Sequence, residues 1–201
     1  ASIVRTYNSQ GVFSDDNGDG WWVNGYRRIV NLTGNVNTSG STIQRVASDN
    51  SVLSFKYDSV SQSYIAQSNN GQHESLRFDS VNSEWTWTDE ATHQTETYAA
   101  SSNIWRLSTS KDADGNTTSY QYNGNYLSAI ISASNDRIEF VYDGINLSSE
   151  RVILADGTIA NTTYYRYDSQ NRLIQAKLDL TPGDNSLSDG KAYVTNYSYL
   201  G

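Results

Sequence analysis

Hydrophobic and polar residues alternate with a period of two in many short segments of the chain. Polar residues flank Trp85 and Trp87, and Ile138, Phe140 and Tyr142 occupy every second position of another segment. Successive side chains of a β-strand point to opposite faces, so this alternation is typical of strands with one buried face. Gly, Asn, Ser and Thr interrupt every window that has helical spacing of apolar residues. The pattern predicts an all-β protein.

A short unit recurs and predicts a series of antiparallel β-hairpins. An aromatic or apolar residue, a polar residue and a second aromatic residue precede Asp or Asn, and a turn and a return strand follow. The copies are Phe55–Asp58, Leu76–Asp79, Tyr120–Asn123, Phe140–Asp143, Tyr165–Asp168 and a partial copy from Tyr197 to Tyr199. Three of the five steps between neighbouring units are roughly 20 to 25 residues, the length of one hairpin. We expect tyrosines of successive hairpins to stack across strands.

The turn chemistry of the unit supports the hairpin prediction. Asp or Asn after the aromatic residue can accept hydrogen bonds from the backbone that follows and so begin a turn. Gly124 and Gly144 come directly after it and tolerate a positive φ angle. In the segment from Tyr167 to Leu173, we expect Asn171 to take the left-handed conformation before the return strand.

The unit from Tyr165 to Leu173 reads Tyr-x-Tyr-Asp-x-x-Asn-Arg-Leu and closely resembles the RHS or YD repeat of bacterial polymorphic toxins, insecticidal toxin complexes and teneurins. Residues 4–9, 20–21 and 26–28 resemble the segment that leads into such repeats, and residues 111–118 are similar to the family's turn between hairpins. The resemblance implies antiparallel hairpin repeats in one continuous curved sheet, an open fragment of a hollow β-shell. It implies a single domain over residues 1–201, with a lead-in segment at residues 1–50 and hairpin repeats at residues 51–201.

The same resemblance implies a non-catalytic structural segment of a large bacterial protein that is secreted or displayed on the cell surface. Its partner would be the remainder of the parent repeat protein, and unpaired sheet edges predict self-association. The alternative is an adhesin module that binds carbohydrate or a host cell surface. The family's self-cleavage motif of Asp-Pro followed by Gly-Leu is absent, because the only proline follows Thr181. We expect no enzymatic activity.

Composition excludes several classes of function. The chain has no Cys, which rules out disulfides, thiol catalysis and thiolate metal sites. A formal net charge of −8 without a basic cluster disfavours nucleic-acid binding. No apolar run approaches the roughly 20 residues that span a bilayer, so we expect no membrane insertion. Aromatic residues make up 12% of the chain, with 15 Tyr and 5 Trp, and supply apolar area for a core.

One segment resembles a calcium-binding loop. Asp15, Asn17 and Asp19, with Gly20, match positions 1, 3, 5 and 6 of the Asp-x-Asn-x-Asp-Gly loop, in which alternate side-chain oxygens converge on a hard cation. The twelfth position is Tyr26, although a bidentate Glu is expected there. A solvated acidic turn is the alternative. Structural calcium at this loop is the only cofactor that the sequence suggests.

Trp85 and Trp87 are candidate glycan-contact residues, because aromatic rings often form platforms for sugars. Packing of both rings in the core is the alternative. The acidic residues near this pair are Glu84, Asp89, Glu90 and Glu96. Glycoside hydrolysis requires two opposed carboxyl groups, but strand alternation favours a solvated outer face for these acids. His73 and His93, the only histidines, are expected on the surface.

Overall fold

The computed structural model describes residues 4–7, 17–68, 73–101, 104–184 and 187–199. The regular elements in these ranges are β-strands and one 3-10 turn, η2 (Pro182–Asp184). Fifteen strands form one antiparallel sheet, while β1 (Arg5–Tyr7) and β2 (Trp21–Val23) form a separate pair. The predicted all-β, antiparallel fold is therefore confirmed. In the part of the chain described, no helix has the length and hydrophobicity needed to cross a membrane.

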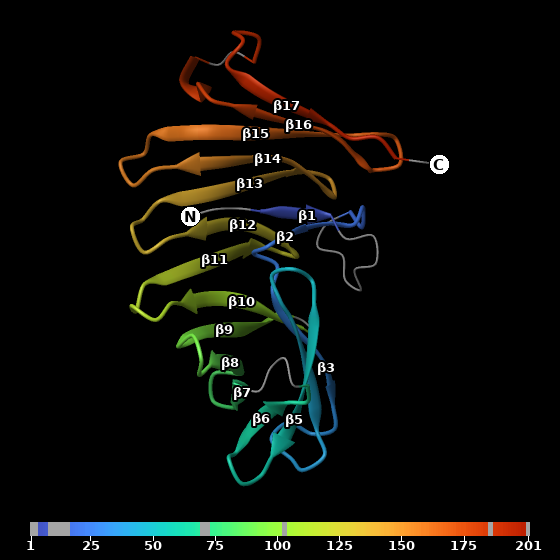
Figure 1. Ribbon diagram of the computed structural model, residues 1–201, viewed down its shortest axis with the longest axis vertical. Coiled ribbons are helices and arrows are strands. Elements are labelled where there is room, and N and C mark those ends of the chain that lie inside the picture. The colour runs from blue at the N-terminus through green and yellow to red at the C-terminus, as the bar shows by residue number, and fades with distance from the viewer. Residues whose placement is uncertain (1–3, 8–16, 69–72, 102–103, 185–186, 200–201) are drawn as a thin grey trace.

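The strands at one end of the sheet close into an eight-stranded barrel (Figure 1). These strands are β3 (Arg28–Thr33), β4 (Thr42–Val46), β5 (Val52–Asp58), β6 (Ser63–Ala66), β7 (Glu74–Asp79), β8 (Glu84–Asp89), β9 (Gln94–Ser101) and β10 (Ile104–Lys111). β10 closes the ring because it pairs with β9 on one edge and, at Trp105 and Arg106, with β3 on the other. The prediction of an open curved sheet throughout is therefore wrong for this part of the chain. The barrel also includes strands on both sides of position 50, where the lead-in segment was expected to end, because β4 pairs with β5.

An apolar layer inside the barrel explains why the ring closes. Each of its eight strands contributes one side chain that is 0% exposed: Ile29, Ile43, Phe55, Tyr64, Leu76, Trp85, Tyr98 and Leu107. The lumen of an eight-stranded barrel is just wide enough to be filled by side chains. Burial of each large apolar side chain contributes about 1.5–3 kcal/mol, and an open sheet would leave this layer in water.

The remaining strands form a curved sheet that we call the wall. Its strands are β11 (Thr117–Asn123), β12 (Tyr126–Ile131), β13 (Arg137–Asp143), β14 (Asn146–Ile153), β15 (Ile159–Tyr167), β16 (Leu173–Asp179) and β17 (Ala192–Asn196). The wall begins where the second half of β10, Thr109–Lys111, pairs with β11. Three hairpins follow in chain order, and β17 forms the open edge of the sheet (Figure 1).

Each wall hairpin carries a β-bulge whose extra residue lies on the return strand, directly after the leucine that pairs with the repeat tyrosine. The register shifts lie between Gln121 and Tyr122, between Val141 and Tyr142, and between Arg166 and Tyr167. A bulge bends its strand and increases the local twist, so one bulge per hairpin curves the wall in a regular way.

The turns of the hairpins have the predicted chemistry. Gly124, Gly144 and Asn171 have φ angles of 59°, 60° and 59°, which confirms the left-handed conformation expected at all three positions. Asp168 Oδ1 accepts hydrogen bonds from the backbone N–H groups of Gln170 and Arg172 at 2.8 and 3.0 Å. The aspartate after the second aromatic residue therefore begins the turn, as the sequence predicts.

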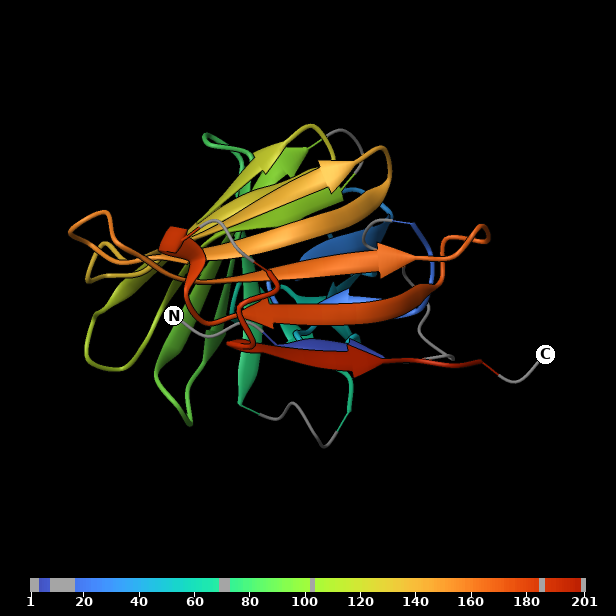
Figure 2. The ribbon, with the colours of Figure 1, turned by 90° about the horizontal axis from the view of Figure 1, so that it is seen from above.

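The β1–β2 pair lies against the concave face of the wall, as the view from above shows (Figure 2). Trp22 and Val23 on β2 are buried in a second core cluster with Leu127, Phe140 and Leu147 of the wall hairpins. The lead-in residues thus provide the apolar partner that a single curved sheet needs for its inner face.

Candidate functional site

Charged side chains lie inside the barrel beside its apolar layer. Arg45 on β4 and Glu96 on β9 are only 7% and 3% exposed. Arg45 Nη2 and Nε lie 2.7 and 3.1 Å from Glu96 Oε2. Arg27, which precedes β3, forms an ion pair with Glu96 Oε1, and the Tyr98 hydroxyl donates a hydrogen bond to Glu96 Oε2. One buried carboxylate therefore joins residues from strands of the barrel that are not neighbours.

A second acidic residue extends this network. Trp87 Nε1 donates a hydrogen bond of 2.6 Å to Glu74 Oε2, and Arg45 Nη1 lies 3.7 Å from the same oxygen. The Arg45 guanidinium carbon lies 3.9 Å from the centre of the Trp87 ring, within the range of a cation–π interaction. The network thus connects β4 with β7, β8 and β9.

The electrostatics of the network oppose acid–base catalysis. Burial alone would raise the pKa of the Glu96 carboxyl, but the charges of Arg45 and Arg27 and the hydrogen bond from Tyr98 outweigh burial and lower this pKa. The pKa of Tyr98 is raised by its burial and by the Glu96 charge. Glycosidases instead need a carboxylic acid whose pKa is raised, so that it can donate a proton. The arrangement is suited to holding strands together.

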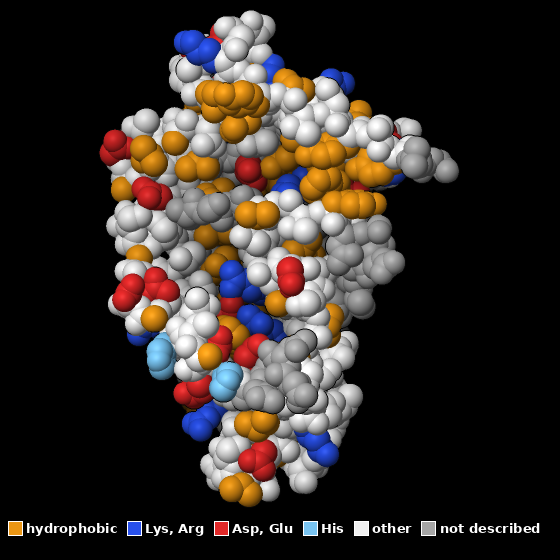
Figure 3. All heavy atoms as spheres, in the orientation of Figure 1, with side chains coloured by type: hydrophobic (Ala, Val, Ile, Leu, Met, Phe, Trp, Pro, Cys, Tyr) orange, Lys and Arg blue, Asp and Glu red, His pale blue; other side chains and the backbone are white. Residues whose placement is uncertain are grey.

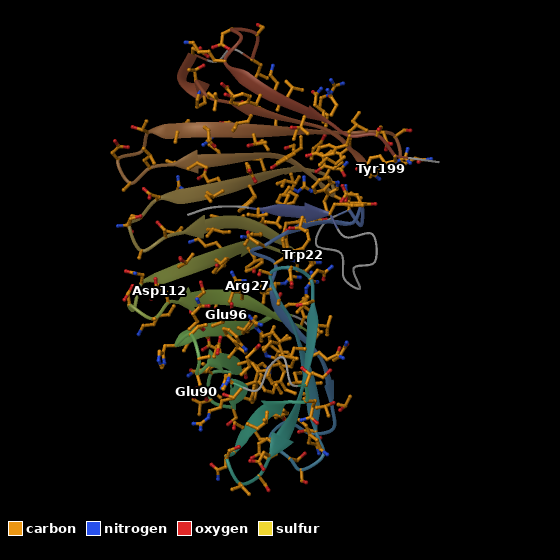
Figure 4. The ribbon with its side chains drawn as sticks, viewed as in Figure 1. Trp22, Arg27, Glu90, Glu96, Asp112 and Tyr199 are labelled. Atoms are coloured by element: carbon orange, nitrogen blue, oxygen red, sulfur yellow. The ribbon has the colours of Figure 1, made fainter. Side chains whose placement is uncertain are left out.

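A polar cleft opens beside this network, where β10 leaves β3 and begins to pair with β11. The cleft has a volume of about 180 Å³ and is lined by Arg27, Gln94, Thr95, Glu96, Ser110, Lys111 and Asp112. Acidic and basic side chains gather in a hollow near the middle of the corresponding face (Figure 3), and Arg27 and Glu96 lie together there (Figure 4). Small-molecule sites are usually larger, about 300–1,000 Å³, and mostly apolar.

The candidate glycan-contact residues Trp85 and Trp87 lie in the barrel interior. Their exposed fractions are 0% and 5%. The Trp85 ring packs edge-on against Tyr64 with a centroid distance of 4.9 Å, and Trp87 contacts Arg45 as described above. Neither ring has an exposed face for a sugar. Both rings pack in the core, which is the alternative interpretation for this pair.

The acidic residues near the tryptophans separate into different environments. Glu96 was expected on a solvated outer face, but it is buried, because it lies on the inward-facing side of β9 and is neutralised by two arginines. Glu90 is exposed and Asp89 begins the β8–β9 turn by accepting a hydrogen bond of 2.9 Å from the Ala91 N–H (Figure 4). His73 and His93 are both exposed, as predicted.

Two of the three candidate calcium ligands are described. Asp15 lies outside the described residues. Asn17 Nδ2 donates hydrogen bonds to Asn146 Oδ1 and to the Asn171 carbonyl, at 2.5 and 2.9 Å, and so contacts the turns of two wall hairpins. Asp19 Oδ1 accepts a hydrogen bond of 2.9 Å from the Trp21 N–H. The described ranges hold no group of three His, Cys, Asp or Glu side chains suited to a metal, and calcium binding stays a prediction.

Our interpretation of the sequence missed the buried ion network, although a signal for it is present. Arg45 follows Ile43 by two residues and Glu96 precedes Tyr98 by two, so each charge shares a strand face with a core side chain. Charged residues are almost never fully buried unless they are paired. Opposite charges on the apolar faces of two strands therefore indicate an ion pair inside the fold.

Repeat tyrosines connect successive hairpins through their hydroxyl groups. Tyr167 donates a hydrogen bond of 2.9 Å to the carbonyl of Leu147, one hairpin earlier. Tyr199 makes the equivalent bond, 2.7 Å long, to the carbonyl of Leu173. These two contacts tie the β15–β16 hairpin and the Tyr199 segment to the backbone of the hairpin before each.

Tyr26 makes a similar connection from the lead-in segment. Its hydroxyl lies 2.7 Å from the hydroxyl of Tyr142 and accepts a hydrogen bond of 2.8 Å from the Leu127 N–H. Its ring also packs edge-on against Tyr122, with a centroid distance of 6.4 Å. Repeat tyrosines of the first two wall hairpins therefore meet at one residue of the lead-in segment.

No family model matches the chain, and no curated protein is significantly similar to it.

Proposed function

We propose that the chain is a non-catalytic structural segment of a large exported bacterial protein of the RHS/YD-repeat type. It builds the closed end of a β-sheet wall, and its partner is the rest of the parent protein. The observation that carries this proposal is the bond from a repeat tyrosine to the preceding hairpin, which is made by Tyr167 to Leu147 and by Tyr199 to Leu173. A bond of this kind can be repeated with every added hairpin, and so suits a wall of variable length.

The topology of the sheet supports the same role. Closure of β3 to β10 removes the sheet edge at one end, and β17 leaves an edge at the other. Exposed edges invite uncontrolled association, so a wall benefits from one end that is sealed. Such a segment sets where the wall begins and the direction in which it extends.

Protease protection in the full-length parent protein tests this function. Phe140 on β13 faces the inner core, whereas the neighbouring Val141 is 50% exposed. If the segment is part of an enclosing wall, Phe140→Asp exposes the enclosed region of the parent to limited proteolysis. Val141→Asp is the matched control and leaves the protection intact. Equal cleavage of the enclosed region in the wild type and in both variants contradicts the proposal.

The alternative function, carbohydrate or cell-surface binding, rests on different aromatic residues from those predicted. Tyr7 and Tyr193 are 47% and 69% exposed. Tyr7 packs against Trp21 with a centroid distance of 5.5 Å, which gives a partly open aromatic surface of the kind that sugars contact. A glycan array with wild type, Tyr7→Ala and Tyr193→Ala distinguishes the two functions. Specific glycan retention that is lost in either variant favours the binding module.

A further inference from the structure

Every wall hairpin pairs its repeat tyrosine with a buried leucine on the return strand. The directly opposed pairs are Tyr122 with Leu127, Tyr142 with Leu147, and Tyr167 with Leu173. The three leucines are 0%, 0% and 1% exposed. In each hairpin the leucine follows the turn closely, and its side chain is fully removed from water. The tyrosine–leucine pair is therefore the constant apolar contact of the repeat.

Tyr199 occupies the repeat-tyrosine position of a further hairpin whose first strand is β17. Its hydroxyl bonds to the Leu173 carbonyl in the same way that Tyr167 bonds to Leu147. The backbone N–H of Tyr197 also bonds to the Ile174 carbonyl at 2.9 Å, so the chain continues along β16 beyond the end of β17. On the side away from β16, β17 is the open edge of the sheet.

The backbone groups at this edge are free to pair with another strand. The hydrogen bonds from the Leu180 N–H to the Lys191 carbonyl and from the Tyr197 N–H to the Ile174 carbonyl fix the alternation of the ladder. In an antiparallel ladder every second residue bonds the neighbouring strand, so Ala192, Val194 and Asn196 direct their N–H and C=O groups outward.

The edge lacks the features that usually prevent pairing. β17 reads Ala-Tyr-Val-Thr-Asn, with neither a charged residue nor a proline. Edge strands that must stay unpaired commonly carry Lys, Pro or a bulge. Next to the edge, Tyr199 and Tyr7 have ring centroids 6.4 Å apart and Tyr7 is 47% exposed, which leaves an apolar surface beside the outward backbone groups.

We propose that the β17 edge is the docking site for one further return strand, in which a leucine stands opposite Tyr199. This inference rests on the proposed function and names the partner that the wall takes. The strand bonds to the outward groups of Ala192, Val194 and Asn196, and its leucine covers Tyr199 and Tyr7. The occupant is not β17 of a second copy, because β17 contains no leucine to fill this position.

A chain extended by one return strand tests this proposal. A copy of residues 168–181 is joined directly after Tyr199, in place of residues 200–201, so that the copied Leu173 falls opposite Tyr199 and the copied Thr181 falls opposite Ala192. Amide hydrogen exchange is then followed at residues 192, 194 and 196. We expect exchange at these amides to slow by about tenfold or more in the extended chain, because burial of one leucine stabilises the added strand by roughly that factor or more. The matched control carries Asp in place of the copied leucine and leaves exchange as fast as in the original chain.

Two further measurements complete the test. Val194→Pro removes an outward N–H but none of the bonds to β16, so it abolishes the protection gained at residues 192 and 196 while the β15–β16 amides stay protected. Light scattering of the unextended chain reports self-association. Protection that is equal with leucine and with Asp, no protection at all, or a dimer whose formation protects β17 overturns the proposal. Proteolysis of the parent protein is independent of these outcomes, so failure of the docking strand and failure of the wall function are distinguishable.

Discussion

Arg45 on β4 and Glu96 on β9 face each other inside the barrel, with Arg45 Nη2 2.7 Å from Glu96 Oε2. Glu96 also pairs with Arg27, so a single carboxylate forms ion pairs with two arginines that are largely removed from water. Breaking a buried ion pair by removal of one partner is strongly destabilising, because the remaining charge is left uncompensated. The barrel therefore depends on Glu96 more than on any exposed acid.

Glu96→Gln is expected to lower the free energy of unfolding by about 3 kcal/mol at neutral pH, the low end of the range for a broken buried pair. Urea-induced unfolding followed by tryptophan fluorescence measures this change. Glu90→Gln is the matched control, because Glu90 is exposed and should change stability by less than about 0.5 kcal/mol. Equal effects of the two substitutions would show that the network contributes nothing beyond the loss of one surface charge.

The contribution of Glu96 should depend on pH in a defined direction. The surrounding arginines lower the pKa of Glu96 in the folded state. A group with a lowered pKa stabilises the fold above its unfolded-state pKa, about 4.3 for Glu, and the contribution is lost as pH falls through the folded-state value. The stability difference between the wild type and Glu96→Gln is therefore constant from pH 8 to about pH 5 and shrinks at lower pH. A difference that grows as the pH falls contradicts this assignment.

Glu150 on β14 should show the opposite pH dependence. Burial raises the pKa of Glu150 and outweighs the hydrogen bonds with Tyr165 and Thr163 and the charge of Arg5, and the Oε2 atom is buried without a hydrogen-bond partner. A raised pKa means that the charged form destabilises the fold above the folded-state pKa and that this cost disappears below the unfolded-state value, about 4.3. Glu150→Gln should increase the free energy of unfolding by about 1 kcal/mol at pH 8, and the gain should vanish towards pH 4. Denaturation at both pH values checks the sign, and a loss of stability at pH 8 would refute it.

The hairpins of the wall could be predicted from the sequence because their signals are local. Asp168 and Asn171 lie four residues or fewer from the groups they bond or the turn they shape, so the left-handed position at Asn171 follows from turn chemistry alone. The same holds for Gly124 and Gly144. Alternation likewise predicted that Ile138 and Phe140 share one face of their strand, and both are buried.

Closure of the barrel could not be predicted in this way, because it depends on pairing between distant strands. β10 meets β3 through Trp105 and Ile29, and nothing in either strand distinguishes this partner from another hairpin. Alternation indicated that Trp85 lies on one face of its strand, but it did not indicate whether core side chains or a bound sugar would cover the ring. In the structure, core side chains of the barrel cover it. The ion pair of Arg45 with Glu96 was missed for the same reason, since its members lie 51 residues apart.

The hydrogen bond from Tyr167 to Leu147 should contribute measurably to wall stability. Tyr167→Phe removes the hydroxyl, so the Leu147 carbonyl loses this donor and Arg5 Nη1 loses an acceptor at 3.2 Å, and we expect a loss of about 1 kcal/mol in the free energy of unfolding. Tyr164→Phe is the control, because Tyr164 lies on the same strand and alternation places it on the opposite face. Chemical denaturation measures both. If Tyr164→Phe costs as much as Tyr167→Phe, the bond to the preceding hairpin is not what stabilises the wall.

Asn17 offers a test that separates a hydrogen-bonded link between hairpins from a calcium ligand. Asn17→Ala removes the donor to Asn146 and Asn171, and we expect the free energy of unfolding to fall by about 1–2 kcal/mol. Asn17→Asp also removes the amide donor, but its carboxylate provides two oxygens suited to calcium. If Asn17 acts through its amide, both variants melt below the wild type, by the same margin in millimolar calcium and in chelator. If the loop binds calcium, the ion stabilises the native state to which it binds, so wild type and Asn17→Asp melt higher in calcium than in chelator while Asn17→Ala does not. Because the first role needs the amide N–H group and the second needs a side-chain oxygen, the behaviour of Asn17→Asp distinguishes them.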